Sequence, residues 1–149
     1  MKQYFIADTH FGHDKYHSEN WEYKFWKKYN SINQDFILYH LGDLSFIHNH
    51  KYLDEIFEKF RKNEHCKNIV LILGNHDFTH NNKLKKLFVE VVPYKEMKDK
   101  VDGKEYSLVL SHYPIMMWNG QHRGTIHLYG HVHNSHESEL YKRFLTEFS

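Results

Sequence analysis

The chain opens with a crowded group of side chains that could bind a metal ion. Asp8, His10 and His13 stand in the stretch DTHFGH, directly after the short apolar run YFIA. Side chains two positions apart in an extended segment point to the same face, so Asp8 and His10 can converge on one point beyond a strand. Because 15 of the 149 residues are histidine, this fragment alone leaves a metal site and a chance spacing open.

Four further polar blocks of the same chemistry follow apolar runs along the chain. They are GD at 42–43, GNHD at 74–77, SH at 111–112 and GHVH at 130–133. The blocks offer carboxylate, amide and imidazole donors, a set suited to Mn²⁺, Fe, Zn²⁺ or Ni²⁺ rather than to Ca²⁺ or Mg²⁺ alone. There are too many donors for one ion, and they suit two ions that share a carboxylate. A glycine before a ligand allows the backbone to turn sharply as it leaves its strand.

The elements that must position these blocks are strands alternating with helices. Apolar runs predict strands at 3–7, 36–41, 68–73, 88–92 and 125–129, and residues 98–111 read as a hairpin that turns at Asp102-Gly103. Apolar residues at helical spacing predict one helix from Trp21 to Ile32, a second from Leu53 to Phe60 and a short basic one at 81–88, whereas the tail stays ambiguous. The carboxyl ends of strands in an α/β domain face one crevice, so all five blocks can meet there.

Composition limits the class of protein. A length of 149 residues predicts a single domain, 1–149. The net charge of +1 gives no basic field for a long phosphate backbone, so a small anionic substrate fits better. The lone Cys66 suits a reducing interior. With neither a signal peptide nor 18 consecutive apolar residues, we expect a soluble, cytoplasmic protein without a membrane partner; the oligomeric state stays open.

In order and spacing, the five blocks resemble the signature of the calcineurin-like metallophosphoesterases. That signature is Asp-x-His, Gly-Asp, Gly-Asn-His-Asp or Glu, a lone His, and Gly-His-x-His. The resemblance spans residues 3–133. It implies an α/β fold, the four-layer α-β-β-α sandwich with mixed sheets. The second sheet is expected to be reduced, because the chain stops 16 residues after His133.

The resemblance also implies a centre of two divalent metal ions, for which we favour Mn²⁺. The implied ligands are Asp8, His10 and His133 for one ion, Asn75, His112 and His131 for the other, and Asp43 as the bridge. His76 would be the catalytic acid. A hydroxide shared by the ions would attack phosphorus in line, and His76 would protonate the leaving oxygen.

The sequence departs from the family in ways that bear on the site and the substrate. Phe46 stands where several members carry a group that orients the catalytic histidine. There is no GDxxDRG block to supply an arginine, and of three arginines only Arg123 lies between the last two polar blocks. Because bidentate arginine clamps favour a terminal phosphate, their scarcity favours a phosphodiester over a phosphomonoester.

Three residues are candidates for substrate binding besides Arg123. Trp118 and Tyr113, in the stretch HYPIMMWNGQHRG, could stack a base, and core packing is the alternative for Trp118. His13 either contacts the phosphate or is a solvated loop residue. We therefore predict a dimetal phosphoesterase that acts on a small, nucleotide-like substrate. The alternatives are a nuclease on DNA or RNA, which the near-neutral charge disfavours, and a non-catalytic binding module, which would be expected to lose ligand positions.

Overall fold

Two sheets form the centre of the computed structural model, which describes residues 1–12, 21–45, 50–77, 84–132 and 136–148. The first sheet is parallel, in the order β1 (Lys2–Ile6), β2 (Phe36–His40), β3 (Cys66–Ile72) and β4 (Glu90–Val92). In the second sheet, β5 (Tyr94–Val101) pairs antiparallel with β6 (Lys104–Ser111), and β6 pairs in parallel with β7 (Ile126–Leu128). The fold is therefore mixed α/β, with one parallel and one mixed sheet.

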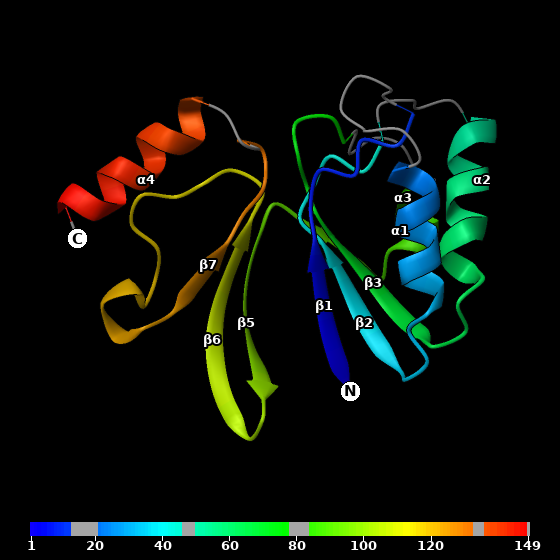
Figure 1. Cartoon of the computed structure of the whole chain (residues 1–149), viewed down its shortest axis with the longest axis horizontal. Helices are drawn as coiled ribbons and strands as arrows, with labels where there is room; N and C mark the ends of the chain where they lie inside the picture. The colour runs from blue at the N-terminus through cyan, green and yellow to red at the C-terminus, as the bar shows by residue number, and fades with distance from the viewer. Residues whose placement is uncertain (13–20, 46–49, 78–83, 133–135, 149) are drawn as a thin grey trace.

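The helices lie on the outer sides of the two sheets. They are α1 (Trp21–Asn30), α2 (His50–Arg61), the short α3 (Leu84–Leu87), a 3₁₀ turn η1 (Gln121–Arg123) and α4 (His136–Phe148). Figure 1 shows α1 and α2 beside the parallel sheet, the second sheet facing its other side, and α4 beyond the second sheet. No helix in the described part of the chain is long and apolar enough to cross a membrane.

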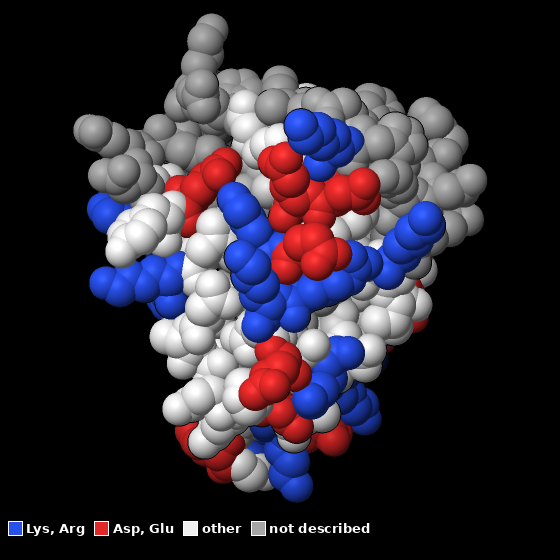
Figure 2. Space-filling view, turned by 90° about the vertical axis from the view of Figure 1, so that its right-hand side faces the viewer, with Lys and Arg blue, Asp and Glu red and all other residues white. Residues whose placement is uncertain are grey.

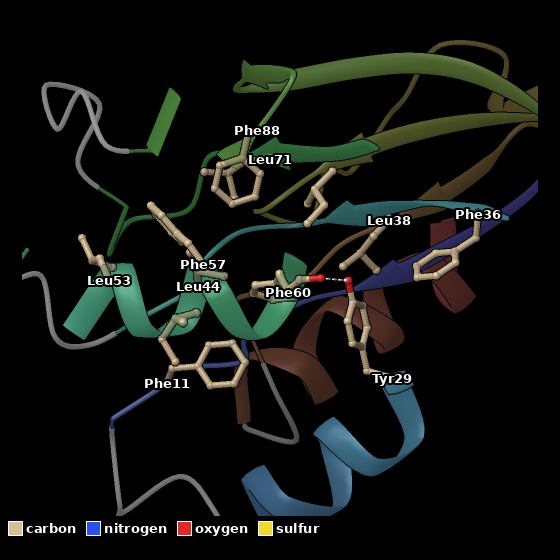
Figure 3. Packing of buried hydrophobic residues seen from close by; sticks show 12 residues of the cluster. Phe11, Tyr29, Phe36, Leu38, Leu44, Leu53, Phe57, Phe60, Leu71 and Phe88 are labelled. Atoms are coloured by element: carbon tan, nitrogen blue, oxygen red, sulfur yellow. Dashed lines mark hydrogen bonds between the residues drawn. The ribbon is translucent and has the colours of Figure 1, made fainter. Parts of the chain in front are cut away.

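An aromatic core joins α1 and α2 to the parallel sheet. Helix α2 buries Leu53, Ile56, Phe57 and Phe60, the spacing that places side chains on one helical face. Figure 3 shows Phe57 and Phe60 gathered with Tyr29 of α1, whose hydroxyl donates a hydrogen bond of 2.7 Å to the carbonyl oxygen of Phe60. Each fully buried phenylalanine contributes roughly 1.5–3 kcal/mol, so this core fixes the helices on the sheet.

A second apolar cluster lies between the two sheets. In β3, Ile69 and Leu71 face the helices, whereas Val70 and Ile72 pack with Leu108 and Leu110 of β6. Alternate side chains of a strand point to opposite faces, and both faces of this strand are covered. The uninterrupted apolar sequence of residues 69–73 follows from that double burial.

Most elements lie where the sequence predicts them. The hairpin turn is confirmed at Asp102 and Gly103, with φ of 51° and 81°, the left-handed pair that a two-residue turn requires. Helix α1 ends at Asn30, so Ile32 packs against the same core from outside the helix. The ambiguous tail forms α4.

Candidate metal centre

The first two polar blocks lie side by side because their strands continue to pair beyond the sheet. The N–H of Asp8 donates to the carbonyl of Gly42 at 2.9 Å, and the N–H of His10 donates to that of Asp43 at 3.0 Å. Both blocks follow the carboxyl ends of neighbouring parallel strands, β1 and β2. Pairing of the backbones therefore brings Asp8, His10 and Asp43 together, as the sequence predicts.

Phe11 anchors the first block in the core. Its side chain is completely buried, and its ring stacks on Trp26 with the centroids 5.4 Å apart. Its backbone N–H donates to Leu44 at 3.0 Å, and its carbonyl accepts from the Ser45 hydroxyl at 3.1 Å. The residue after the predicted ligand His10 thus ties the loop to the aromatic core, a role that sequence reasoning missed.

Strained backbone conformations are concentrated at the predicted ligands. Five non-glycine residues of the described chain have positive φ, and four of them are predicted ligands: Asp8 at 55°, His10 at 42°, Asp43 at 58° and His131 at 70°. The left-handed conformation costs an L-residue roughly 1–2 kcal/mol, and such strain is typical of functional sites. The fold holds these side chains in place against a local conformational cost.

Two groups of donors share one carboxylate. Asp8, His10 and Asp43 form one group, and Asp43, His112 and His131 form the other; within each, the donor atoms lie within 4.8 Å of one another. Asp43 Oδ2 lies 3.6 Å from His10 Nε2 and 3.3 Å from His112 Nε2. Atoms bound about 2.1 Å from one ion lie about 3.0–3.4 Å apart in octahedral or tetrahedral geometry, so the spacing fits metal ligands after small adjustments.

Asn75 joins the second group. Its Oδ1 lies 3.1 Å from His112 Nε2 and 3.2 Å from His131 Nδ1. The backbone N–H of His131 also donates to Asp8 Oδ2 at 3.0 Å, which links the loop after β7 to the loop after β1. Residues from both sheets therefore build the centre.

His76 lies at the edge of the first group. Its ring centroid is 5.6 Å from that of His10, and its backbone N–H donates to Asp43 Oδ1 at 2.9 Å. The side chain is half-buried. This position puts His76 next to the carboxylate that the two groups share without placing it among either group of donors.

Hydrogen bonds shift the pKa values of Asp43 and His112. Burial opposes ionisation of Asp43, but hydrogen bonds from His112 and from the backbone of His76 lower its pKa below the ordinary value. Burial likewise works against the charged form of His112, but Asp43 and the Leu41 carbonyl together raise its pKa. The 2.8 Å contact from His112 Nδ1 to that carbonyl leaves Nε2 directed at Asp43 and Asn75. Such an outer partner fixes the orientation of a ligating histidine.

Asp77 acts as a clamp, because its carboxylate holds the loop after β2 and the loop after β3 together. Its carboxylate accepts from the backbone N–H groups of Asp43 at 2.8 Å, Leu44 at 3.0 Å and Gly74 at 2.9 Å. The sequence analysis assigned Asp77 no role of its own. The signal that could have identified it is the carboxylate that closes the GNHD block.

His40 is a second positioning residue that the sequence analysis missed. The Thr9 hydroxyl donates to the Leu44 carbonyl at 2.7 Å, so it accepts the hydrogen bond from His40 Nε2 at 2.9 Å. The N–H of Gly42 donates to His40 Nδ1 at 3.1 Å. These bonds fix one neutral tautomer, and burial lowers the pKa of His40 to about 4. The signal in the sequence is a histidine that ends the apolar strand FILYH.

The glycines of the blocks serve two different purposes. Gly42 has a φ of 101°, so the predicted sharp turn is confirmed there. For Gly74 and Gly130 that explanation is wrong, because neither has positive φ. A Cβ at Gly74 would collide with the Asp43 carboxylate, and one at Gly130 would lie 2.7 Å from Asp8 Oδ2. These two glycines allow the carboxylates to approach the backbone closely.

The structure does not bring every predicted site residue to the centre. Trp118 Nε1 donates to the Thr125 carbonyl at 2.7 Å, and Arg123 lies in η1 beside His122. Both contacts precede β7, whereas His131 follows it (Figure 1). Their substrate-binding roles stay predictions. His13 and His133, and also Phe46, lie outside the described residues.

Comparisons with known proteins bear on the fold. Neither a protein-family model nor a curated protein matches the chain. A solved structure of a protein of unknown function from Aquifex aeolicus is similar, with 28% sequence identity and a TM-score of 0.56. The match covers 75% of this chain and 60% of that one. The chain therefore shares its mixed α/β fold with a protein of unknown function.

Proposed function

We propose that this protein is a dimetal-dependent phosphoesterase of the calcineurin-like metallophosphoesterase type. The observation that carries the proposal is the shared carboxylate of Asp43, which belongs to both groups of donors. The order of the layers, with helices outside two facing sheets, is compatible with the α-β-β-α sandwich of that family, and the second sheet is small, with three strands (Figure 1).

The donor set fits two divalent ions. Asp8 and His10 would hold one ion and Asn75, His112 and His131 the other, with Asp43 between them; His133 stays a predicted ligand of the first. Carboxylate, amide and imidazole donors together suit Mn²⁺, Fe, Zn²⁺ or Ni²⁺, and Mn²⁺ remains our choice. When bound, such ions supply Lewis-acid activation of water and of a phosphate oxygen.

His76 would donate a proton to the leaving oxygen. Its place beside the first group and its half-buried side chain allow it to touch both substrate and solvent. The backbone N–H of His76 donates to Asp43 Oδ1 at 2.9 Å, which ties the residue to the carboxylate that the two groups share. Imidazole is the side chain that most often serves as a general acid, which suits this role.

We favour a phosphodiester as the substrate. A terminal phosphate carries a second negative charge that arginine pairs commonly neutralise. Arg61 pairs with Glu58 on α2 at 2.7 Å, and Arg123 contacts His122 at 3.1 Å. These two arginines are engaged away from the donor groups, so a singly charged ester suits the site better.

The net charge of +1 and the face that α1 and α2 cover (Figure 2) favour a small substrate over a nucleic acid. Figure 2 shows acidic and basic side chains interspersed on the side of the molecule that α1 and α2 cover in Figure 1. A surface that tracks a phosphate backbone carries clustered Lys and Arg. A nuclease therefore remains the alternative.

Hydrolysis by the metal-loaded protein tests the proposal. After treatment with chelator and reloading with Mn²⁺, the protein should hydrolyse bis-p-nitrophenyl phosphate faster than p-nitrophenyl phosphate. His131→Gln should lose most of this activity, whereas His122→Gln, an exposed histidine of η1, should retain it. No metal-dependent hydrolysis of either ester by the unsubstituted protein would refute the proposed function.

A further inference from the structure

Tyr113 presents an exposed aromatic ring directly beside the second group of donors. Its ring centroid lies 4.5 Å from that of His131 and 5.1 Å from that of His112, yet 49% of the residue is exposed. The planes are tilted by 55° and 83°, so Tyr113 meets the imidazoles at an angle rather than stacking flat on them. The ring therefore borders the centre and remains accessible to a ligand.

The backbone at Tyr113 is held in place. Its carbonyl accepts a 2.6 Å hydrogen bond from the Ser111 hydroxyl, and that hydroxyl in turn accepts from His127 Nε2 at 2.8 Å. Pro114 follows, and a proline restricts the residue before it to extended conformations. A tyrosine has only two side-chain torsions to order on binding, so it offers contact area at a low entropic cost.

The side chains of His76 and Tyr113 lie beside different groups of donors. His76 contacts His10 of the first group, and Tyr113 contacts His112 and His131 of the second. In the proposed function, His76 serves the leaving group. Of the two, Tyr113 is then the ring available to the substituent that stays on phosphorus.

We propose that Tyr113 is a specificity-determining residue that stacks on a planar ring, such as a nucleobase, in the non-leaving part of a phosphodiester substrate. This inference rests on the proposed function and narrows its substrate to nucleotide-like diesters. A base presents a flat π face to an exposed phenol ring, and loss of one such contact typically weakens binding about 5- to 150-fold.

A pair of esters with the same leaving group isolates this contact. Thymidine 5′-(p-nitrophenyl phosphate) and ethyl p-nitrophenyl phosphate both release p-nitrophenolate, so the ratio of their kcat/KM values reports the non-leaving group alone. The Mn²⁺-loaded protein should prefer the thymidine ester. Tyr113→Ala and Tyr113→Leu should lower the ratio at least about fivefold, and Tyr113→Phe should keep it, because it retains the ring. The matched control is Met117→Ala, which alters an 83% exposed residue on the same segment.

The outcomes separate this inference from the proposed function. Hydrolysis of both esters with a ratio that Tyr113→Ala and Tyr113→Leu leave unchanged would overturn the role of Tyr113 alone. An unchanged ratio that results from equal loss of kcat/KM on the two esters would indicate a structural role for Tyr113. No hydrolysis of either ester by the unsubstituted protein would overturn the proposed function and this inference together.

Discussion

Asp43 satisfies several requirements at once, which explains why another residue would not serve at this position. Its backbone is left-handed, its N–H is held by Asp77, and its carboxylate lies close to histidines of both donor groups. Asparagine tolerates the left-handed conformation but lacks the charge that would hold two cations. A substitution by asparagine therefore separates the electrostatic role from the backbone role.

The role of His76 can be measured by changing the leaving group. His76→Ala should lower kcat on the order of 10²–10⁴-fold for an alkyl or nucleoside leaving group. The loss should be much smaller for p-nitrophenolate, which is stable as an anion and needs no proton. Steady-state kinetics on the two types of ester, with metal content measured in parallel, provide the comparison. Equal losses on both, with metals retained, would mean that His76 binds phosphate instead of acting as the acid.

Asp77 should matter for stability as well as for activity. Asp77→Asn replaces one acceptor oxygen by an NH₂ group, which faces backbone N–H groups that need an acceptor. Leaving buried donors unpaired costs on the order of 2–3 kcal/mol in the free energy of unfolding. Urea denaturation in the presence of chelator measures this loss of unfolding free energy without a contribution from metals. Asp102→Asn, in the exposed hairpin turn, is the control, and an equally small effect of both changes would contradict the clamp.

At the scale of elements, the sequence predicts the strands well because their signals are local. Double burial of β3 leaves an uninterrupted apolar run, and the Asp102-Gly103 pair specifies its turn by its own conformational preference. The order of polar blocks after strands likewise predicts which side chains meet. The clamp of Asp77 on Asp43 was not predictable, because it joins residues 34 positions apart and depends on the atomic spacing of two loops.

Two buried histidines link the packing of the elements to pH. Burial lowers the pKa values of His40 in β2 and His127 in β7 to about 4, below the usual 6.5. Between these values the unfolded chain binds protons that the folded chain does not, so stability falls as the pH falls from about 6.5 to about 4. The slope is about 1.4 kcal/mol per pH unit for each histidine. His112, whose pKa is raised, acts in the opposite direction, since its contribution to stability is lost as the pH rises.

A variant isolates one of these contributions. His127→Phe removes one titrating group, so its unfolding free energy should depend less steeply on pH between 4 and 6.5. Denaturant unfolding at several pH values measures the difference in slope. The exposed His122→Phe should leave the slope unchanged, and a slope equally steep in both variants would show that His127 is not buried in its neutral form.

At the scale of the whole molecule, the centre joins the two sheets. Asp8, His10 and Asp43 follow strands of the parallel sheet, whereas His112 and His131 follow strands of the mixed sheet. A metal held by both would bind the folded state alone, since the unfolded chain does not bring these residues together. Chelator should therefore lower the melting temperature by several degrees, and Mn²⁺ should restore it. An unchanged melting temperature, with activity also retained in chelator, would contradict the linkage.

Counting bound metal ions in the Asp43→Asn variant tests the central claim most directly. We expect about two ions per chain in the unsubstituted protein reconstituted with Mn²⁺, and at most one in Asp43→Asn, because the amide cannot balance two cations. Asp102→Asn changes the same residue type in the same left-handed conformation at the hairpin turn and should keep both ions. Native mass spectrometry gives the stoichiometry. Two tightly bound ions in Asp43→Asn, or none in the unsubstituted protein, would contradict a dimetal centre bridged by Asp43.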